Sequence, residues 1–257
     1  MGKVRVIAVT NQKGGVGKTT TAINLSACLA AAGKKVLAID ADQQGNTTSG
    51  LGLDKNAMEW TIYDVFLEQA TIEEVKQPTC VEGLEVLPAN ISLTGAEIEL
   101  IGKEEREYIL KRALDEVKQA YDFVIIDCPP SLNLITINAL TAADTVLVPI
   151  QCEYFALEGL EQLLHAVNLV KKRLNRNLEI EGIVFTMYDA RTNLSLQVVE
   201  EVKRSLGANV YRTIIPRNVR LGESPSHGLP IHLYDPKSKG AESYGLLAEE
   251  VMEKEWD

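Results

Sequence analysis

The segment between residues 12 and 20 combines glycines, two lysines and two threonines in the order of a phosphate-binding loop. Glycines let backbone N–H groups surround phosphate oxygens, and the N-terminus of a following helix adds partial positive charge. Lys18 can reach the β- and γ-phosphates of a nucleotide, the Thr19 hydroxyl can bind Mg²⁺, and Thr20 can reach the α-phosphate. The residues expected to bind the nucleotide are Lys13, Gly14, Gly15, Val16, Gly17, Lys18, Thr19 and Thr20.

This loop departs from the standard P-loop pattern at its start. The pattern has Gly at position 12, whereas this chain has Gln12 followed by a second lysine, Lys13. A glycine-rich turn without a ligand is the alternative interpretation. The apolar run before the loop, the helical pattern after it and the two lysines all favour phosphate binding. The departure therefore indicates a variant P-loop.

Two other apolar runs end in aspartate. Asp40 and Asp42 close one of them, and Asp127 closes another. Because the carboxyl ends of parallel strands face the ligand crevice of such sheets, these carboxylates are expected near the loop. A carboxylate there can orient an attacking water or bind Mg²⁺ through water. For Asp40 a structural role is as well supported as a catalytic one.

Short apolar runs alternate with helical patterns along the chain, which is typical of an α/β fold. The predicted strands are Val4–Thr10, Val36–Asp40, Asp122–Asp127, Thr145–Ile150, Ile180–Met187 and Val210–Pro216. The predicted helices are Thr19–Ala32, Lys103–Ala120, Tyr154–Leu174 and Leu194–Leu206. Nearly continuous apolar strands predict a mostly parallel twisted sheet with helices on both faces.

No linker, repeat or low-complexity segment divides the chain, so residues 1–257 are predicted to form a single P-loop NTPase domain. Residues 41–100 are rich in Gly, Thr and Asn and are predicted to be functional loops with short helices. The composition, 46% hydrophobic and 24% charged, excludes a disordered chain, a collagen and a small disulfide scaffold. No apolar run approaches the roughly 20 residues of a transmembrane helix.

The four cysteines and three histidines show no metal-ligand spacing. Reduced, buried thiols in a cytosolic protein are the prediction for Cys28, Cys80, Cys128 and Cys152. Charge is uneven along the chain, because residues 171–220 carry ten basic and five acidic side chains in a protein of net charge −10. Such a basic segment can face phosphates, although charge alone favours a solvated helix surface.

The loop and both carboxylate segments resemble the ParA/MinD group of ATPases, whose deviant Walker A motif has an additional lysine. The segments 187–194, 216–220 and 223–228 look like those of the chromosomal ParA, or Soj-like, branch. The similarity covers nearly the whole chain, to about Gly245. One departure is Gln43, where the group usually has Pro, and it implies altered loop mobility rather than lost chemistry.

The resemblance implies ATP and Mg²⁺ as cofactors and catalytic roles for Lys13, Lys18 and Asp42. Lys13 would cross a dimer interface to the partner subunit's phosphates, and Asp42 would position the attacking water. Thr19 and Asp127 would hold Mg²⁺, Asp127 through water, and Asp42 would stand in its outer shell.

Other roles implied by the resemblance lie in the second half of the chain. Pro216 and Asn218 would contact adenine, and Arg191 and Arg220 would bind DNA through its backbone, without regard to sequence. Glu153 matches a segment of the group as well, and either a dimer contact or a ribose contact is open for it.

The implied function is that of an ATPase for chromosome or plasmid partitioning. ATP would join two subunits into a sandwich dimer that binds double-stranded DNA, and slow hydrolysis, stimulated by a ParB-type centromere-binding protein, would release it. The expected location is the cytoplasm, in association with the nucleoid. Because the first strand is expected at residue 4, no N-terminal helix-turn-helix domain is predicted.

Three alternatives remain at this point. A MinD-like ATPase that cycles on membranes needs a basic amphipathic C-terminal helix, whereas residues 249–257 are acidic. An iron–sulfur carrier needs cluster-binding cysteines, and neither Cys128 nor Cys152 lies in such a pattern. A metabolic P-loop enzyme would be expected to have a separate substrate lid domain, which the pattern lacks.

Overall fold

The computed structural model of this chain describes residues 4–153, 156–206 and 209–254, and one eight-stranded sheet runs through them. The strand order is β3-β4-β2-β5-β1-β6-β7-β8, and every neighbouring pair is parallel except β3 and β4. The strands are β1 (Arg5–Val9), β2 (Val36–Asp40), β3 (Gln77–Pro78), β4 (Leu84–Leu87), β5 (Phe123–Asp127), β6 (Thr145–Gln151), β7 (Glu179–Tyr188) and β8 (Val210–Pro216). The predicted mostly parallel sheet is confirmed.

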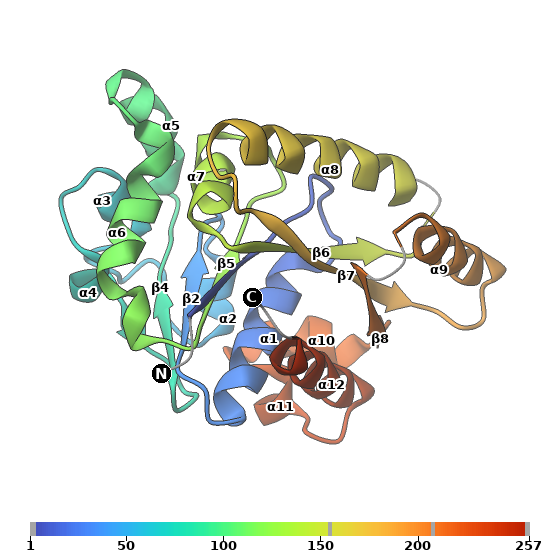
Figure 1. Ribbon diagram of the computed structural model, residues 1–257. Helices are drawn as coiled ribbons and strands as arrows, with labels where there is room; N and C mark the ends of the chain where they lie inside the picture. The colour runs from blue at the N-terminus through green and yellow to red at the C-terminus, as the bar shows by residue number, and fades with distance from the viewer. Residues whose placement is uncertain (1–3, 154–155, 207–208, 255–257) are drawn as a thin grey trace.

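Helices cover both faces of this sheet, as predicted (Figure 1). One face carries α3 (Ile62–Phe66), α4 (Ile72–Val75), α5 (Leu93–Glu99), α6 (Ile109–Val117), α7 (Leu134–Ala142), α8 (Ala156–Arg173) and α9 (Asn193–Leu206). The other carries α1 (Lys18–Ala31), α2 (Asn46–Gly50), α10 (Val219–Glu223), α11 (Ile231–Tyr234) and α12 (Lys239–Glu253). Each face has its own apolar core, which is why the central strands are apolar on both sides.

The central strand β1 shows how one short run supplies both cores. Val6 and Ala8 pack into the core under α6, α7 and α8, whereas Ile7 and Val9 pack into the core under α1 and α12. This division follows from the two-residue period of a strand, which points successive side chains to opposite faces. All of β1 is buried, so β1 holds the loop that follows it on a rigid support.

Several elements were not among the predicted ones, including the strand β3 and the helices α10 and α11. The strand β4 lies in the segment predicted to be loops with short helices, and it pairs with β2 from Val36 to Ile39. Its four residues are too few to show a period, so only the pairing with β2 makes them a strand. The helices α7 and α12 were likewise not predicted.

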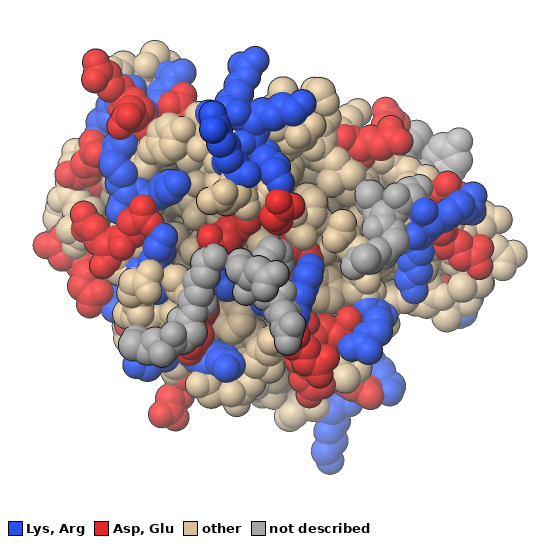
Figure 2. All heavy atoms as spheres, viewed as in Figure 1, with Lys and Arg blue, Asp and Glu red and all other residues tan. Residues whose placement is uncertain are grey.

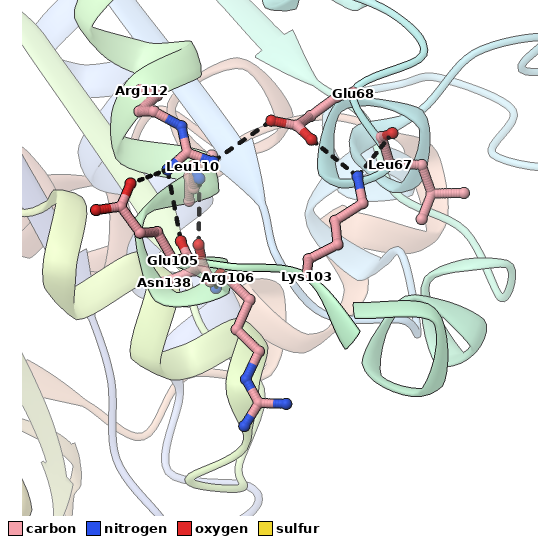
Figure 3. Close-up of polar contacts among 8 residues, drawn as sticks. All are labelled: Leu67, Glu68, Lys103, Glu105, Arg106, Leu110, Arg112 and Asn138. Carbon is pink, nitrogen blue, oxygen red and sulfur yellow. Dashed lines mark hydrogen bonds and ion pairs between the residues drawn. The ribbon is translucent and has the colours of Figure 1, made fainter. Parts of the chain in front are cut away.

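The single helix predicted over Lys103–Ala120 is wrong. The structure has a 3₁₀ turn at 106–108, α6 over 109–117 and another 3₁₀ turn at 118–120. Glu105 precedes them with φ +49°, a left-handed conformation that a continuous helix excludes. Its carboxylate lies 3.4 Å from Arg112, whose other guanidinium nitrogen lies 3.4 Å from Glu68 (Figure 3).

A buried ionic cluster joins the amino end of the sheet to α12. The guanidinium of Arg5 pairs with Glu181, through two bonds, and its Nη1 also donates to the Val251 carbonyl at 2.7 Å. Thr145 and Tyr211 donate their hydroxyls to the same carboxylate at 2.7 and 2.6 Å. Glu181 is fully buried, and all its bonds therefore form in a water-poor setting where a charge needs partners.

We expect Glu181→Ala to lower the free energy of unfolding by about 3–5 kcal/mol, because the Arg5 guanidinium then stays buried without this carboxylate. Urea denaturation of the nucleotide-free protein measures the loss. Glu179→Ala is the control, since Glu179 lies on the same strand and is 59% exposed in its pair with Lys171, so about 1 kcal/mol or less is expected. Equal losses in both variants would contradict the role given to the buried cluster.

Candidate nucleotide site

The predicted phosphate-binding loop lies between β1 and α1, at the carboxyl edge of the sheet. Gly15 and Gly17 have φ +74° and +88°, a backbone conformation that L side chains rarely adopt. Apart from the adjacent residues, no described atom lies within 4 Å of a Cβ built on Gly14 or Gly15, so the described part of the chain leaves the loop open on that side. Because Gly17 precedes the first residue of α1, the free N–H groups of this helix face the loop.

The loop is held from two neighbouring strands. Thr186 of β7 donates its hydroxyl to the Val16 carbonyl at 2.8 Å, and Asn11 donates its side-chain amide to the Pro149 carbonyl at 2.8 Å. Both side chains are buried. Sequence reasoning missed Thr186, because a threonine on a distant strand carries no signal of what it will contact. These bonds position the loop before any ligand arrives, which lowers the entropic cost of binding.

Lys18 begins α1 and is largely buried, with 7% of its surface exposed. Its ammonium donates to the Lys13 carbonyl at 2.9 Å, across the mouth of the loop. Burial lowers the pKa of Lys18, while the nearby Asp127 and Asp42 carboxylates act in the opposite direction. An anionic phosphate beside Lys18 would supply the negative charge that stabilises a buried ammonium.

The predicted strand-end carboxylates meet at the same edge. Asp40 and Asp127 face each other in the register of the paired strands β2 and β5, and both are buried. Thr48 donates its hydroxyl and its backbone N–H to Asp40, at 2.7 and 2.8 Å, and Thr47 donates its hydroxyl to Asp127 at 2.8 Å. Thr47 and Thr48 belong to α2 and were not predicted to take part. They tie the helix after the Asp42 loop to both carboxylates.

The surroundings of Asp127 fit a cation. Its Oδ1 is a buried oxygen without a hydrogen-bond partner among the described residues. Burial and the neighbouring Asp40 charge raise the pKa of Asp127, whereas the hydroxyls of Thr47 and Thr19 favour its ionised form. A divalent cation would offset both the burial and the charge repulsion. Thr19 and Asp127 thus lie together as an oxygen pair of the kind Mg²⁺ takes alongside nucleotide phosphates.

Asp42 is half-buried in the loop between β2 and α2. Its backbone N–H donates to Asp40 at 3.2 Å, and its own Oδ1 accepts from the Gln44 N–H at 2.9 Å. Its charge acts on Asp40, on Asp127 and on Lys18, so it stands within electrostatic reach of all three. Among the described residues, none forms a hydrogen bond with its second carboxylate oxygen, Oδ2.

A cavity of about 470 Å³ opens beside the end of the phosphate loop. Pro216 and Asn218 line it together with Gly17 and Thr20, so the structure brings the two predicted base-contacting residues to the phosphate loop. Thr186, Met187 and Tyr244 also line it and were not predicted. The cavity is predominantly apolar, as a site for a flat aromatic base has to be.

Lys13 has a partner within its own chain. Its ammonium forms an ion pair with Glu153, and the two side chains are 40% and 32% exposed. Its backbone N–H donates to the Asn11 side chain at 3.0 Å. Glu153 lies just after β6, so the pair sits at the same sheet edge as the phosphate loop. Glu153, whose role the sequence left open, thus contacts Lys13 in the single chain.

The arginines predicted to bind DNA follow the ends of β7 and β8. Arg191 comes after β7, and Arg220 lies in α10, after β8. The Arg217 N–H donates to the Tyr188 carbonyl at 3.0 Å, which joins the two strand ends. Arg191 is 86% exposed and Arg220 is 54% exposed. Both therefore lie at the nucleotide edge of the sheet with their side chains open to solvent.

The basic segment 171–220 does not form one surface. Lys171, Lys172 and Arg173 close the last turn of α8, where Figure 2 shows Lys and Arg side chains gathered. Arg191 and Arg217 lie beyond the other end of β7. A ten-residue strand spans about 33 Å, so this separation places the two groups at opposite edges of the sheet.

Two further observations concern the predicted absences. Of the four cysteines predicted to be buried, Cys28, Cys128 and Cys152 are buried, whereas Cys80 is exposed, so the prediction is wrong for Cys80. Among residues 4–153, 156–206 and 209–254, no group of three His, Cys, Asp or Glu side chains could hold a metal, and no helix is long and apolar enough to cross a membrane.

Comparison with known proteins shows which family this chain resembles. The family model described as an AAA domain matches residues 4–180. The chain is 61% identical over 251 residues to the sporulation initiation inhibitor protein Soj of Bacillus subtilis, with 98% of each chain covered. It is 54% identical to the chromosome partitioning protein ParA of Myxococcus xanthus, with 98% of this chain and 89% of that protein covered.

Solved structures share the fold over nearly the whole chain. Cobyrinic acid a,c-diamide synthase from Mycobacterium smegmatis, solved with bound ADP and magnesium, has a TM-score of 0.86 at 40% identity, with 97% and 94% of the two chains covered. The septum site-determining protein MinD from Pyrococcus horikoshii, complexed with Mg-ADP, has a TM-score of 0.83 at 28% identity, with 98% and 97% covered. With 51–61% identity to four curated Soj and ParA proteins over nearly its full length, the chain belongs to the ParA/Soj family of chromosome-partitioning ATPases.

Proposed function

We propose that this protein binds ATP with Mg²⁺, dimerises on it, and uses the dimer to bind DNA without sequence preference. The observation that carries the proposal is the convergence of Lys18, Thr19, Asp42 and Asp127 at one sheet edge beside an apolar cavity. Phosphates would lie against the loop and Lys18, and adenine would enter the cavity at Pro216 and Asn218. Two similar structures hold ADP or Mg-ADP, which supports the same class of ligand here.

Thr19 would hold Mg²⁺, and Asp127 would hold it through water. The buried Asp127 Oδ1 without a partner supports this place for the ion. When bound, Mg²⁺ neutralises charge that develops on the phosphates. Oδ2 of Asp42 forms no hydrogen bond with a described residue. Asp42 would orient the attacking water, and it would also lie in the outer coordination shell of Mg²⁺.

The second lysine explains why hydrolysis would depend on dimerisation. In the single chain the Lys13 ammonium is paired with Glu153. In a face-to-face dimer the exposed Lys13 side chain would reach the partner's phosphates, as an arginine finger does in other NTPases. The enzyme would then be a slow ATP hydrolase that is stimulated by a partner.

The biological role that follows is DNA partitioning. The ATP-bound dimer would hold chromosomal or plasmid DNA in the cytoplasm, on the nucleoid, through Arg191 and Arg220. A ParB-type protein bound to its DNA site would stimulate hydrolysis and release the dimer. All these steps fit a single domain over residues 1–257, because the sheet that carries the nucleotide edge also carries the arginines.

Two of the three alternatives left open by the sequence find less support. A membrane-cycling role needs a helix with a free apolar face, but α12 buries Tyr244, Leu247, Ala248 and Val251 in the core against α1. A metabolic role is suggested only by the name of the 40% identical synthase. The higher identities to Soj and ParA proteins favour partitioning.

The proposed function is tested by DNA binding with ATP, with ADP and without nucleotide, on unrelated duplexes at two salt concentrations. We expect binding only with ATP, the same for every sequence and weaker in high salt. Arg191→Glu and Arg220→Glu should each weaken it about tenfold or more, because a phosphate contact is lost in both subunits and a repulsive charge replaces it.

Arg173→Glu is the matched control for this experiment. It makes the same charge reversal at the end of α8, at the opposite edge of the sheet, so a change below about threefold is expected. Equal losses of DNA affinity in all three variants would show that net charge, and not the position of Arg191 and Arg220, governs binding. No binding by the unaltered protein in any nucleotide state would overturn the DNA role, and anionic vesicles would then be tested.

A further inference from the structure

Each arginine proposed to bind DNA is ion-paired with a carboxylate of its own chain. The Arg191 guanidinium makes two parallel bonds to Asp189, with Nε to Oδ1 at 2.8 Å and Nη2 to Oδ2 at 2.6 Å. The Arg191 backbone N–H donates to the same carboxylate at 3.1 Å. This two-bond geometry is the one in which arginine also binds a phosphate group. Asp189 therefore occupies the position that a DNA phosphate would take.

Arg220 is paired in a similar way. Its Nη1 lies 2.8 Å from a carboxylate oxygen of Glu223, and its Nε lies 3.5 Å from Asp235. The Tyr234 hydroxyl donates to the same Glu223 oxygen at 3.3 Å, so it helps to hold that carboxylate in place. The second arginine, which lies 29 positions further along the chain, thus meets two acidic side chains.

Asp189 also acts on a third arginine. Arg217 follows β8, next to the end of β7, and its charge helps to lower the pKa of Asp189 together with the bonds from Arg191. Asp189 is therefore ionised at neutral pH and lies between two arginines that come from neighbouring strand ends. The basic character of this edge is reduced by carboxylates that the same loops supply.

Exposure decides whether such pairs can exchange. Arg191 is 86% exposed and Arg220 is 54% exposed, and ion pairs in water contribute little because solvent screens both charges. A DNA phosphate, which lies in the strong field of the whole duplex, can displace an exposed carboxylate. The displaced carboxylate remains close to the duplex and repels it, so each pair lowers the affinity without preventing binding.

We propose that Asp189 and Glu223 are internal competitors for the phosphate-binding arginines, which weaken DNA binding so that the dimer can leave DNA when ATP is hydrolysed. The inference rests on the proposed DNA role of Arg191 and Arg220. In this inference, two acidic residues regulate the affinity of the arginine surface for DNA. The direction of the effect distinguishes it from a structural role. Removing a negative charge here should strengthen DNA binding.

The test uses Asp189→Asn, Glu223→Gln and the double variant in the full chain. Each amide keeps the size of the side chain and one oxygen that accepts a hydrogen bond, but it removes the negative charge and replaces the other oxygen by an NH₂ donor. Asp115→Asn is the matched control, because Asp115 lies on α6, pairs with Lys118 of the 3₁₀ turn that follows, and its substitution changes the net charge equally. Affinity for one 40-base-pair duplex is measured at saturating ATP, since Glu223 also lines the base cavity.

We expect about threefold tighter binding for each single variant, about tenfold for the double variant, and less than about 1.5-fold change for Asp115→Asn. The gain should shrink as salt is raised, because screening weakens the removed repulsion. If the unaltered protein binds DNA and the variants bind equally or more weakly, the carboxylates position the arginines instead, and the inference is wrong. If the unaltered protein binds no DNA with ATP, the proposed function fails, and the inference fails with it.

Discussion

Lys18→Ala is expected to weaken ATP binding by about 100-fold or more. Lys18 is the buried cation of the phosphate loop, and its ammonium stands across the loop mouth from the Lys13 carbonyl. Removing one partner of a buried, hydrogen-bonded charge pair costs about 2–5 kcal/mol, which corresponds to a factor of about 30 to several thousand in affinity. Calorimetric titration with a slowly hydrolysed ATP analogue and Mg²⁺ measures the change directly.

The stability of the variant shows whether the loss of ATP binding comes from the missing ammonium or from unfolding. Because burial lowers the pKa of Lys18, its charged form is less stable in the folded chain than in water, and Ala at this position relieves that cost. The free energy of unfolding without nucleotide should therefore fall by no more than about 1 kcal/mol. Lys35→Ala, at an exposed lysine beyond the other end of α1, should leave ATP binding unchanged. Tight ATP binding by Lys18→Ala would refute the phosphate-loop assignment.

Asp42→Ala is expected to reduce ATP hydrolysis by about 100-fold and to leave ATP binding within a few-fold. Its carboxylate acts electrostatically on Lys18 and Asp127, and positioned groups that orient or deprotonate an attacking nucleophile contribute about 10²–10⁴ in rate. The dimer formed with ATP should persist on DNA, because the step that releases it is blocked. Phosphate release in the presence of DNA and the lifetime of the dimer by light scattering are the two measurements.

Asp54→Ala supplies a closely matched control for that variant. Asp54 also lies in a loop, and its Oδ1 accepts from the N–H two residues further on, at 3.0 Å, as the Oδ1 of Asp42 does at 2.9 Å. Both substitutions remove the same kind of turn bond, but only Asp42 lies beside the phosphate loop. An Asp42→Ala protein that hydrolyses ATP at the unaltered rate would remove the water-positioning role.

The two variants give opposite results on one assay. A protein that cannot bind ATP should not bind DNA, whereas a protein that binds ATP and cannot hydrolyse it should stay on DNA. Binding of DNA by Lys18→Ala, or rapid release by Asp42→Ala, would break the link between nucleotide state and DNA binding on which the proposed function depends. The pair therefore tests the switch as well as the two residues.

Part of the fold could be predicted because its signals are local. Each of β1, β2 and β5 is an apolar run long enough to show burial on both faces, and Gly17 marks where α1 begins. The strand β4 could not be predicted, since four residues show no period and their pairing with β2 is a long-range contact. The helix expected from Lys103 failed because Glu105 takes a left-handed conformation that a helical pattern does not report.

The sequence by itself determined the type of fold, the phosphate loop and the aspartates at the strand ends, because these features depend on residues that are close together in the chain. Only the tertiary structure decided that Thr186 holds the phosphate loop, that Thr47 holds Asp127, and that Lys13 pairs with Glu153. All three contacts join different parts of the fold. A sequence pattern specifies which side chains each element presents, but the packing of those elements decides which side chains meet.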